Sequence, residues 1–271
     1  MSGRLMSGLR RAAEYVRIIR ICWRATIAAE FEYQVNFWAG LALSFFWMFW
    51  AAAGLAVYFQ YTGDLFGWTY PELLVVIGLF FTVNGIRQAV FQPNLQQVTD
   101  YVRLGTLDFL LTKPVDAQIM VSLPRLNMGN LLDPLLGMVF TIVGFVLSDT
   151  PIGMNLVQFV MLFVSAILAL YALMVLLMAL AVRIVGGTEL QRIAYGAVEL
   201  SRFPVQLYRN PLQTILTLVP IILLTTLPAE ALLGRLSPYW LVAGPAVTVL
   251  SLVVARFAWR RAIRAYSGAS A

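Results

Sequence analysis

The sequence predicts an all-α membrane protein, folded as a single domain over residues 1–271 with six transmembrane helices. The first reason is composition: 61% of the 271 residues are hydrophobic and only 12% are charged, whereas roughly a quarter of a soluble domain is charged. The second reason is the spacing of the charges, because 33–63 and 150–182 carry none. About 20 apolar residues are enough for a helix to cross a bilayer, so each run can hold a span.

Residues 1–32, before the first span, are expected to form an amphipathic elbow helix that lies in the membrane interface. Apolar residues recur there at steps of three and four, which gathers them on one helical face: Leu5, Leu9, Ala12, Val16, Ile19, Trp23 and Ile27. Arg10, Arg17 and Arg24 are spaced seven apart on the flank of that face. A basic helix of this kind binds anionic lipid headgroups, and packing on other protein is the alternative.

The six spans are expected where apolar residues run without interruption: 33–60, 72–91, 129–148, 154–182, 211–229 and 239–256. Asp133-Pro134 opens the third span and has the pattern of an acidic cap followed by proline in the first turn. A functional carboxylate at Asp133 is the less favoured alternative. Pro220 interrupts the fifth span, where a proline kinks a helix. Two roles for the kink remain open: it takes part in gating of the transport pathway, or it only allows the helices to pack.

Arg87 lies towards the end of the second span. An ionisable residue inside a membrane segment is a candidate functional residue by default, so Arg87 is a candidate substrate contact. Because it lies near the end of the span, its side chain can instead extend to the membrane interface. The sequence favours the second interpretation and leaves the first open.

The positive charges predict the orientation. All 19 Lys and Arg residues except Arg235 fall before the first span, in the segments 92–128 and 183–211, in or beside the C-terminal tail, or at the edge of the second span. Lys and Arg accumulate on the cytoplasmic side of membrane proteins. Both termini and both of these segments are therefore predicted to be cytoplasmic, which agrees with an even number of spans.

Several kinds of chemistry are excluded by the residue types that the sequence lacks. It has no histidine, one cysteine, Cys22, and one lysine, Lys113. A Ser-His-Asp triad cannot form, and most metal sites lack their ligands. Lys113 precedes Pro114, so it cannot belong to a phosphate-binding Gly-Lys-Ser/Thr loop. We expect no catalytic residue, metal site or cofactor in this chain, and no nucleic-acid surface on a chain that is otherwise membrane.

The stretch Tyr101–Val115 is a polar island between the second and third spans. A short helical pattern of apolar residues reaches Val102, and a second short apolar run ends at Lys113-Pro114. Gly105 lies between the two runs, and glycine commonly ends a helix in the left-handed conformation. The sequence predicts two short helices with a corner at Gly105, outside the bilayer. Spacing alone is equally consistent with a plain connecting loop.

A family resemblance lies in the run 105–115, which reads Gly-Thr-Leu-Asp-Phe-Leu-Leu-Thr-Lys-Pro-Val. It is similar to the Gly-Thr-Leu-acid-x-Leu-Leu-x-x-Pro signature in the first cytosolic loop of type-2 ATP-binding-cassette (ABC) exporter permeases. The segments Phe203–Pro211 and Pro228–Gly234 resemble a bacterial subgroup of these permeases more loosely, and the elbow helix and six spans also agree. One departure is 101–104, where many members carry an acidic-basic-acidic run.

The resemblance implies a permease subunit in the bacterial plasma (inner) membrane that moves a substrate out of the cell. ATP and Mg would bind a separate pair of ATPase subunits, and 92–128 would hold the coupling helix that docks on them. Leu107, Leu110 and Leu111 would bury in a cleft of the ATPase. Arg103, Asp108 and Lys113 would be polar partners. The expected coupling residues are Tyr101, Arg103, Gly105, Thr106, Leu107, Asp108, Leu110, Leu111, Lys113 and Pro114.

Partners and alternatives complete the expectations. Six spans are few for a pathway, so a second permease copy or a sister permease is expected, besides anionic lipids at the N-terminal helix. Arg87 and Pro220 are the candidates for substrate contact or gating. A self-contained secondary transporter or channel is the alternative function, and it would need charged residues buried at mid-span. A membrane-embedded enzyme or assembly factor is less consistent with the residue types present. The substrate stays open between amphipathic or lipid-like, polysaccharide, drug and peptide cargoes.

Overall fold

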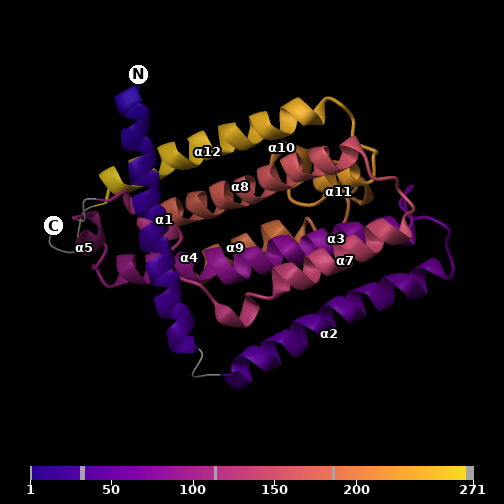
Figure 1. Ribbon diagram of the computed structural model, residues 1–271, viewed down its shortest axis with the longest axis horizontal. Helices are drawn as coiled ribbons and strands as arrows, with labels where there is room; N and C mark the ends of the chain where they lie inside the picture. Colours follow the sequence, from indigo (N-terminus) through magenta and orange to yellow (C-terminus); the bar gives the residue numbers. More distant parts are fainter. Residues whose placement is uncertain (1, 31–33, 113–114, 185–186, 267–271) are drawn as a thin grey trace.

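The computed structural model describes residues 2–30, 34–112, 115–184 and 187–266. Within these ranges the chain forms helices and turns and no β-strand. The longer helices lie side by side in one elongated bundle, and α1 crosses it (Figure 1). In chain order the helices are α1 (Ser2–Glu30), α2 (Gln34–Phe59), α3 (Tyr70–Ile86), the π-helical η2 (Arg87–Phe91), α4 (Gln92–Arg103), α5 (Asp108–Leu111), α6 (Ala117–Ser122), η3 (Met128–Asn130), α7 (Asp133–Leu147), α8 (Met154–Arg183), α9 (Gly187–Glu199), η4 (Val205–Leu207), α10 (Leu212–Leu218), α11 (Thr226–Leu232) and α12 (Trp240–Arg264).

Five helical segments of the described chain are long and apolar enough to cross a membrane. They are Trp38–Phe59, Tyr70–Arg103, Met128–Leu147, Met154–Arg183 and Trp240–Arg264. They coincide with five of the six expected spans. The chain is therefore an all-helical, multi-pass membrane protein, as the composition predicts.

The bundle has two chemically different ends. Helices α4, α8 and α12 all end at one of them, with Arg103, Arg183 and Arg264 as their last residues. We call this the basic end. The opposite end, called the far end, holds the turns 60–69 and 148–153. In Figure 1 the basic end is on the left and the far end on the right.

Helices α3 and α7 pack with their backbones unusually close, and glycine makes this possible. A Cβ on Gly78 of α3 would lie 2.4 Å from the backbone nitrogen of Thr141 in α7. A Cβ on Gly137 of α7 would lie 2.4 Å from the backbone nitrogen of Thr82 in α3. Ordinary van der Waals contact needs 3.4–4 Å. Small residues let membrane helices approach in this way, and here only glycine fits at either position.

The second span is longer than the sequence predicts, because its helix continues through η2 into α4 and ends at Arg103. Pro93 has no N–H to donate within the helix. The carbonyl of Ala89, four residues earlier, accepts a hydrogen bond from the N–H of Asn127 at 2.8 Å instead. The π-helical turn, a rare geometry, occurs at this point. The first of the two short helices expected around Gly105 is thus the end of the second span.

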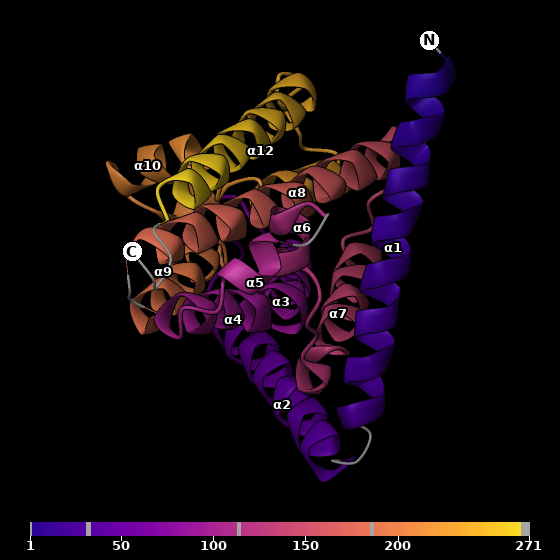
Figure 2. The same cartoon turned by 90° about the vertical axis from the view of Figure 1, so that its left-hand side faces the viewer.

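Helix α1 runs crosswise to the bundle near the basic end (Figure 1), and Figure 2 shows it along one side of the bundle. Trp23 donates from its indole Nε1 to the carbonyl of Leu123 at 2.7 Å. The N–H of Asp116 donates to the hydroxyl oxygen of Tyr15 at 2.9 Å. These contacts attach α1 to the loop that follows the second span. Several of its arginines, such as Arg17, are exposed.

The expected fifth span, 211–229, is not one helix. Its residues form α10 and α11, which have seven residues each. Pro220 lies in the turns between them, so the prediction that it kinks a spanning helix is wrong. At 1.5 Å per residue each helix is about 10 Å long, about a third of the thickness of a bilayer core. Neither helix can cross a membrane by itself.

The chain instead crosses the bundle through α9 and the segment 200–208. Helix α9 begins at the basic end, directly after α8 has ended there. Arg202 then lies over the ring of Phe80, in the second half of α3, at 4.9 Å from its centroid. Gln206 donates from Nε2 to Oε1 of Glu230 in α11 at 2.7 Å. Figure 1 shows α10 and α11 on the far-end side of the bundle.

The segment 183–211 thus does not stay at one end of the bundle, as expected for a loop between two spans. Helices α8 and α12 run parallel, since Thr248 donates to the carbonyl of Ser165 and Gly244 faces the side chain of Leu162. One crossing is therefore required between these two helices, and α9 with the residues after it supplies it. Hydropathy misses the segment because it carries charged residues. The described structure pairs two of them, Glu199 and Arg202, at 2.8 Å.

Candidate functional site

The corner predicted at Gly105 is present at the basic end. Gly105 has a φ of +66°, in the left-handed region that glycine enters without strain. The N–H of Thr106 donates to the carbonyl of Tyr101 at 2.9 Å, and the N–H of Gly105 donates to that of Val102 at 3.2 Å. This pair of hydrogen bonds is the Schellman motif, which satisfies free carbonyls at a helix end. It turns the chain from α4 towards α5.

Leucines hold α5 against the rest of the protein. Leu107 is fully buried, and Leu110 and Leu111 are half-buried against the main hydrophobic core. Residues spaced three and four apart share one helical face. The prediction that Leu107 buries in a partner is wrong, because the chain's own core already covers it. For Leu110 and Leu111, which are partly exposed, contact with a partner stays a prediction. Their role here is to fix the position of α5.

Two other apolar side chains at the corner are exposed. Leu104 is 66% exposed and Phe109 is 73% exposed. The sequence-based interpretation missed both, although a signal existed: Phe109 falls on the helical face opposite to the three leucines. Large apolar side chains that face outward on a fixed base are typical of a protein contact site.

The polar residues of the corner have modest intramolecular contacts. Arg103 pairs with Asp100 at 3.2 Å, and both side chains are more than half exposed. Exposed pairs of this kind contribute little to stability. Asp108 is the first residue of α5 and lies near Tyr266, just after α12. Burial, and then the charge of Asp108, raise the pKa of Tyr266. The end of α12 therefore lies beside α5.

The remaining predicted coupling residues are less informative. The hydroxyl oxygen of Tyr101 accepts a hydrogen bond from Gln97, and Tyr101 packs on the core. Thr106 is half-buried. Lys113 and Pro114 lie outside the described residues.

The segment 115–123, which we call the junction segment, joins the corner to three helices. Asp116 accepts a hydrogen bond from the N–H of Gln118 at 2.9 Å and so caps α6. Arg256 of α12 donates to the two carboxylate oxygens of Asp116 at 3.0 and 2.5 Å and to Oε1 of Gln118 at 2.8 Å. Gln118 in turn donates to the hydroxyl of Tyr171 in α8 at 3.0 Å. Helix α1 is bound to the same segment by the two hydrogen bonds described above.

The ion pair between Asp116 and Arg256 favours the ionised form of the Asp116 carboxylate. Burial by itself would raise the pKa of Asp116. The hydrogen bonds and charge of Arg256, together with two backbone N–H donors, outweigh burial and hold that pKa below its ordinary value. Neither Asp116 nor Arg256 is among the candidate residues that the sequence predicts. No local pattern reveals a pair 140 residues apart.

Arg87 is buried, with 2% of its surface exposed, so the prediction that it extends to the interface is wrong. Its guanidinium donates to Oδ1 of Asn84 at 3.1 Å and to Oε1 of Gln92, and lies 5.7 Å from the ring centroid of Tyr195. These contacts hold η2 against α9. A substrate contact by Arg87 stays a prediction.

Asp133 is also buried, with 5% of its surface exposed. Pro134 occupies the first turn of α7, as predicted. The carboxylate does not cap the helix, however. Its Oδ2 accepts a hydrogen bond from Nδ2 of Asn130 at 2.9 Å, and its Oδ1 has no hydrogen-bond partner. Within the described ranges, no group of three Cys, Asp or Glu side chains is arranged to hold a metal ion.

Comparison with known proteins adds one match. The model of the family described as ABC-2 family transporter protein matches residues 45–270. The matched region includes the corner, the junction segment and all helices from the second half of α2 onward. No curated protein and no solved structure matches the chain.

Proposed function

The chain belongs to the ABC-2 family of transporter proteins, and on that premise we propose that it is the permease subunit of an ABC exporter driven by a separate ATPase. The corner between α4 and α5 is the docking site in this proposal. The observation that carries it is the pair of exposed apolar side chains, Leu104 and Phe109, on a base fixed by buried leucines. Exposed apolar side chains of this kind can enter a cleft on a partner without any loss of packing inside the permease.

The orientation of the proposal follows from the charges. The basic end carries Arg103, Arg183 and the arginines that close α12, whereas Arg235 and Arg209 are the arginines towards the far end among the described residues. By the positive-inside rule the basic end faces the cytoplasm. A cytoplasmic ATPase can reach α5 only in this orientation. Both described chain ends, near α1 and α12, are then cytoplasmic.

The junction segment supports a route by which movement of α5 reaches the bundle. It directly follows the corner and is hydrogen-bonded to α1, α8 and α12 through Tyr15, Tyr171 and Arg256. An ATPase can shift a conformational equilibrium only through contacts that differ between its states. A displaced α5 would pull on the junction segment and, through it, on two long helices of the bundle.

Two further partners belong to the proposal. A second copy of the chain, or a sister permease, would pack beside the exposed aromatic helix α2, on which Phe45 is 55% and Phe49 is 56% exposed. Anionic lipids would meet the exposed arginines of α1, such as Arg17 and Arg24. The direction of transport is taken to be outward, on the resemblance of the corner to exporter permeases of the plasma membrane.

Co-purification tests the docking proposal. A tagged chain is isolated in mild detergent from its native cell and its partners are identified by mass spectrometry. We expect a stoichiometric partner with a Gly-Lys-Ser/Thr phosphate-binding loop. The change Phe109→Ala should lower its recovery about tenfold or more, because truncating a central aromatic contact commonly costs about 2 kcal/mol.

The matched control is Ile152→Ala, which removes an equally exposed apolar side chain, 76% exposed, at the far end. It should leave recovery of the partner unchanged. Equal recovery with all three proteins would show that Phe109 does not contact the ATPase. A clean preparation without any ATPase would favour a self-contained transporter.

A further inference from the structure

A cleft of about 620 Å³ opens between α2, the end of α3, the start of α7 and the end of α9. Its volume is in the range of sites for small molecules. Its walls combine aromatic side chains with amide and charged groups: Trp47, Trp50, Phe80, Asn84, Asp133 and Glu199. The combination of apolar walls with a few convergent polar groups is typical of a ligand site rather than of lipid-facing surface.

Two buried side-chain atoms of the cleft have no hydrogen-bond partner among the described residues: Oδ1 of Asp133 and Nε of Arg202. Of the two side chains, Asp133 is the one without an ion pair. It is 5% exposed, and its Oδ1 makes no hydrogen bond. Its one hydrogen bond comes from the neutral amide of Asn130, and no ion pair of the described residues includes it. A buried carboxylate oxygen without a hydrogen-bond donor destabilises the protein. A ligand that donates to Oδ1 would remove this destabilisation.

The other carboxylate that lines the cleft already has a charged partner. Glu199 pairs with Arg202 at 2.8 Å, and Arg202 also lies over the ring of Phe80. Arg87, behind Asn84, has its guanidinium bonded to two side-chain amides. Asp133 is therefore the negative charge that a ligand can neutralise. A hydroxyl ligand would satisfy the hydrogen bond but leave this charge uncompensated, whereas an ammonium would provide both the hydrogen bond and the opposite charge.

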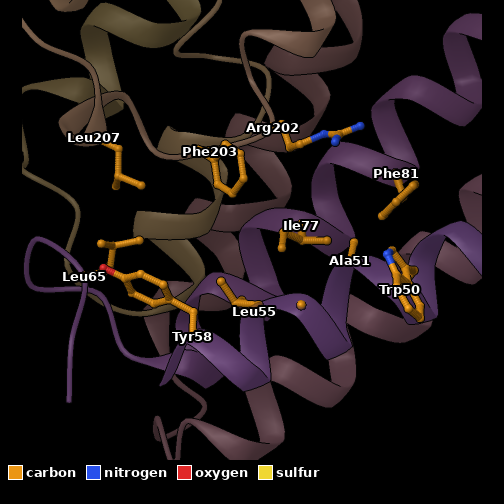
Figure 3. Close-up of a pocket in the computed structure, with 11 residues that line it drawn as sticks. Trp50, Ala51, Leu55, Tyr58, Leu65, Ile77, Phe81, Arg202, Phe203 and Leu207 are labelled. Atoms are coloured by element: carbon orange, nitrogen blue, oxygen red, sulfur yellow. The ribbon is translucent and has the colours of Figure 1, made fainter. Parts of the chain in front are cut away.

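A second cleft of about 430 Å³ continues from the first towards the far end. The two share Trp50, Ala51, Phe81 and Arg202. Figure 3 shows Trp50, Phe81 and Arg202 at one end of this second cleft and Tyr58 and Leu65 at the other, with apolar side chains between them. The chain thus provides an acidic group, Asp133, at one end of a continuous path, the paired Arg202 where the two clefts meet, and apolar walls towards Tyr58.

We propose that these clefts bind an amphipathic organic amine, with its ammonium group at Asp133 and its apolar body along α2 towards Tyr58. The proposal deepens the proposed function and rests on it for the claim that such a ligand is cargo. The binding site itself is independent of the ATPase. It can therefore be tested, and can fail, without reference to docking at Phe109.

The test compares two probes with the same apolar body and different end groups, a charged ammonium and a neutral hydroxyl: 4-phenylbutylamine and 4-phenylbutan-1-ol. Each is titrated calorimetrically into the full chain, with any subunit that co-purifies, in neutral phosphatidylcholine nanodiscs, and empty nanodiscs give the background. We expect the wild-type protein to bind the amine about tenfold or more tightly than the alcohol. Asp133→Asn should weaken amine binding about ten- to a hundredfold, the range for a lost charge-assisted hydrogen bond, and should leave alcohol binding within about twofold.

The matched control is Asp149→Asn, which makes the same change at an exposed turn of the far end. Asp149 has a φ of +51°, which asparagine tolerates well, and amine binding should be unchanged. Retained amine affinity in a folded Asp133→Asn protein would overturn the proposal. If that variant does not fold, the wild-type comparison decides, because equal affinity for amine and alcohol would overturn the proposal by itself. An ATPase that still co-purifies in either case would leave the permease assignment standing.

Discussion

The contact between α3 and α7 gives the sharpest stability prediction. Gly78→Ala places a methyl group 2.4 Å from the backbone nitrogen of Thr141 and 2.8 Å from the carbonyl oxygen of Gly137. Ordinary contact begins at 3.4 Å, so the shortfall to the nitrogen is 3.4 − 2.4 = 1.0 Å. Both neighbours are backbone atoms of a long helix and cannot rotate away. The two helices must therefore separate along their contact.

The expected magnitude follows from two opposing effects. Inserting a methyl group into a filled contact costs about 1–3 kcal/mol. Replacing glycine by alanine inside a helix stabilises it by about 0.5–1 kcal/mol. The free energy of unfolding should fall by roughly 1–2 kcal/mol, which lowers the thermal midpoint by roughly 2–8 °C in a protein of this size.

The matched control is Gly54→Ala, which makes the same change in α2, where a Cβ would meet nothing within 4 Å. It should leave the thermal midpoint unchanged or raise it slightly, because only the helix propensity changes. The assay heats both variants in detergent and follows the remaining monodisperse protein by size-exclusion chromatography. Equal midpoints for Gly78→Ala and Gly54→Ala would refute the argument that backbone contact excludes a side chain at Gly78.

Two further predictions concern ion pairs at opposite ends of the bundle. Asp116→Asn should lower the free energy of unfolding by about 1 kcal/mol at pH 7. The pKa of Asp116 in the folded protein is below its ordinary value. The difference in stability from wild type should therefore persist above pH of about 4 and vanish as the pH falls through the lowered pKa. A difference in thermal midpoint that is constant down to pH 3 would contradict this pairing. Arg235→Gln removes the guanidinium that donates to Glu72 at 2.8 Å and to the carbonyl of Gly67 at 2.9 Å. Backbone hydrogen exchange in the turn 60–69 should then become faster. Unchanged exchange there would show that the pair of Arg235 and Glu72 does not stabilise the turn.

The sequence was a good guide wherever burial by lipid decides the structure. The charge-free runs 33–63 and 150–182 correspond to α2 and α8, because a lipid-facing helix tolerates few charges. The corner at Gly105 was also predictable, since its left-handed conformation is a local property of glycine and of two backbone hydrogen bonds.

The path of the chain between α8 and α12 could not be predicted from hydropathy. The segment 211–229 is more apolar than α9, yet it folds into two short helices in the far half of the bundle. The segment that passes from the basic end to the far end contains Glu199 and Arg202, whose charges are tolerated inside the bundle because they pair with each other and because Arg202 lies over Phe80. Hydropathy scores each side chain against lipid and takes no account of such pairs.

At the candidate site, too, the sequence predicts local features but not the contacts that depend on tertiary packing. Leucines in a loop indicate an apolar face, but not whether that face meets a partner or the chain's own core. At Leu107, Leu110 and Leu111 it meets the core, and the outward position falls to Phe109. The helical phase of three and four was present in the sequence and would have separated the two faces. The pair formed by Asp116 and Arg256, in contrast, depends on the packing of α12 and has no local signal.

Site-specific photo-crosslinking tests the central claim, ATPase docking at the corner, most directly. A photoreactive amino acid replaces Phe109 in one protein and the fully buried Leu107 in another, and both are irradiated in native membranes. The adducts are then identified by mass spectrometry. The account predicts a crosslink from position 109 to a subunit with a Gly-Lys-Ser/Thr loop and no such crosslink from position 107. A properly inserted protein that gives no ATPase adduct at position 109, or gives it at position 107 instead, would contradict the account.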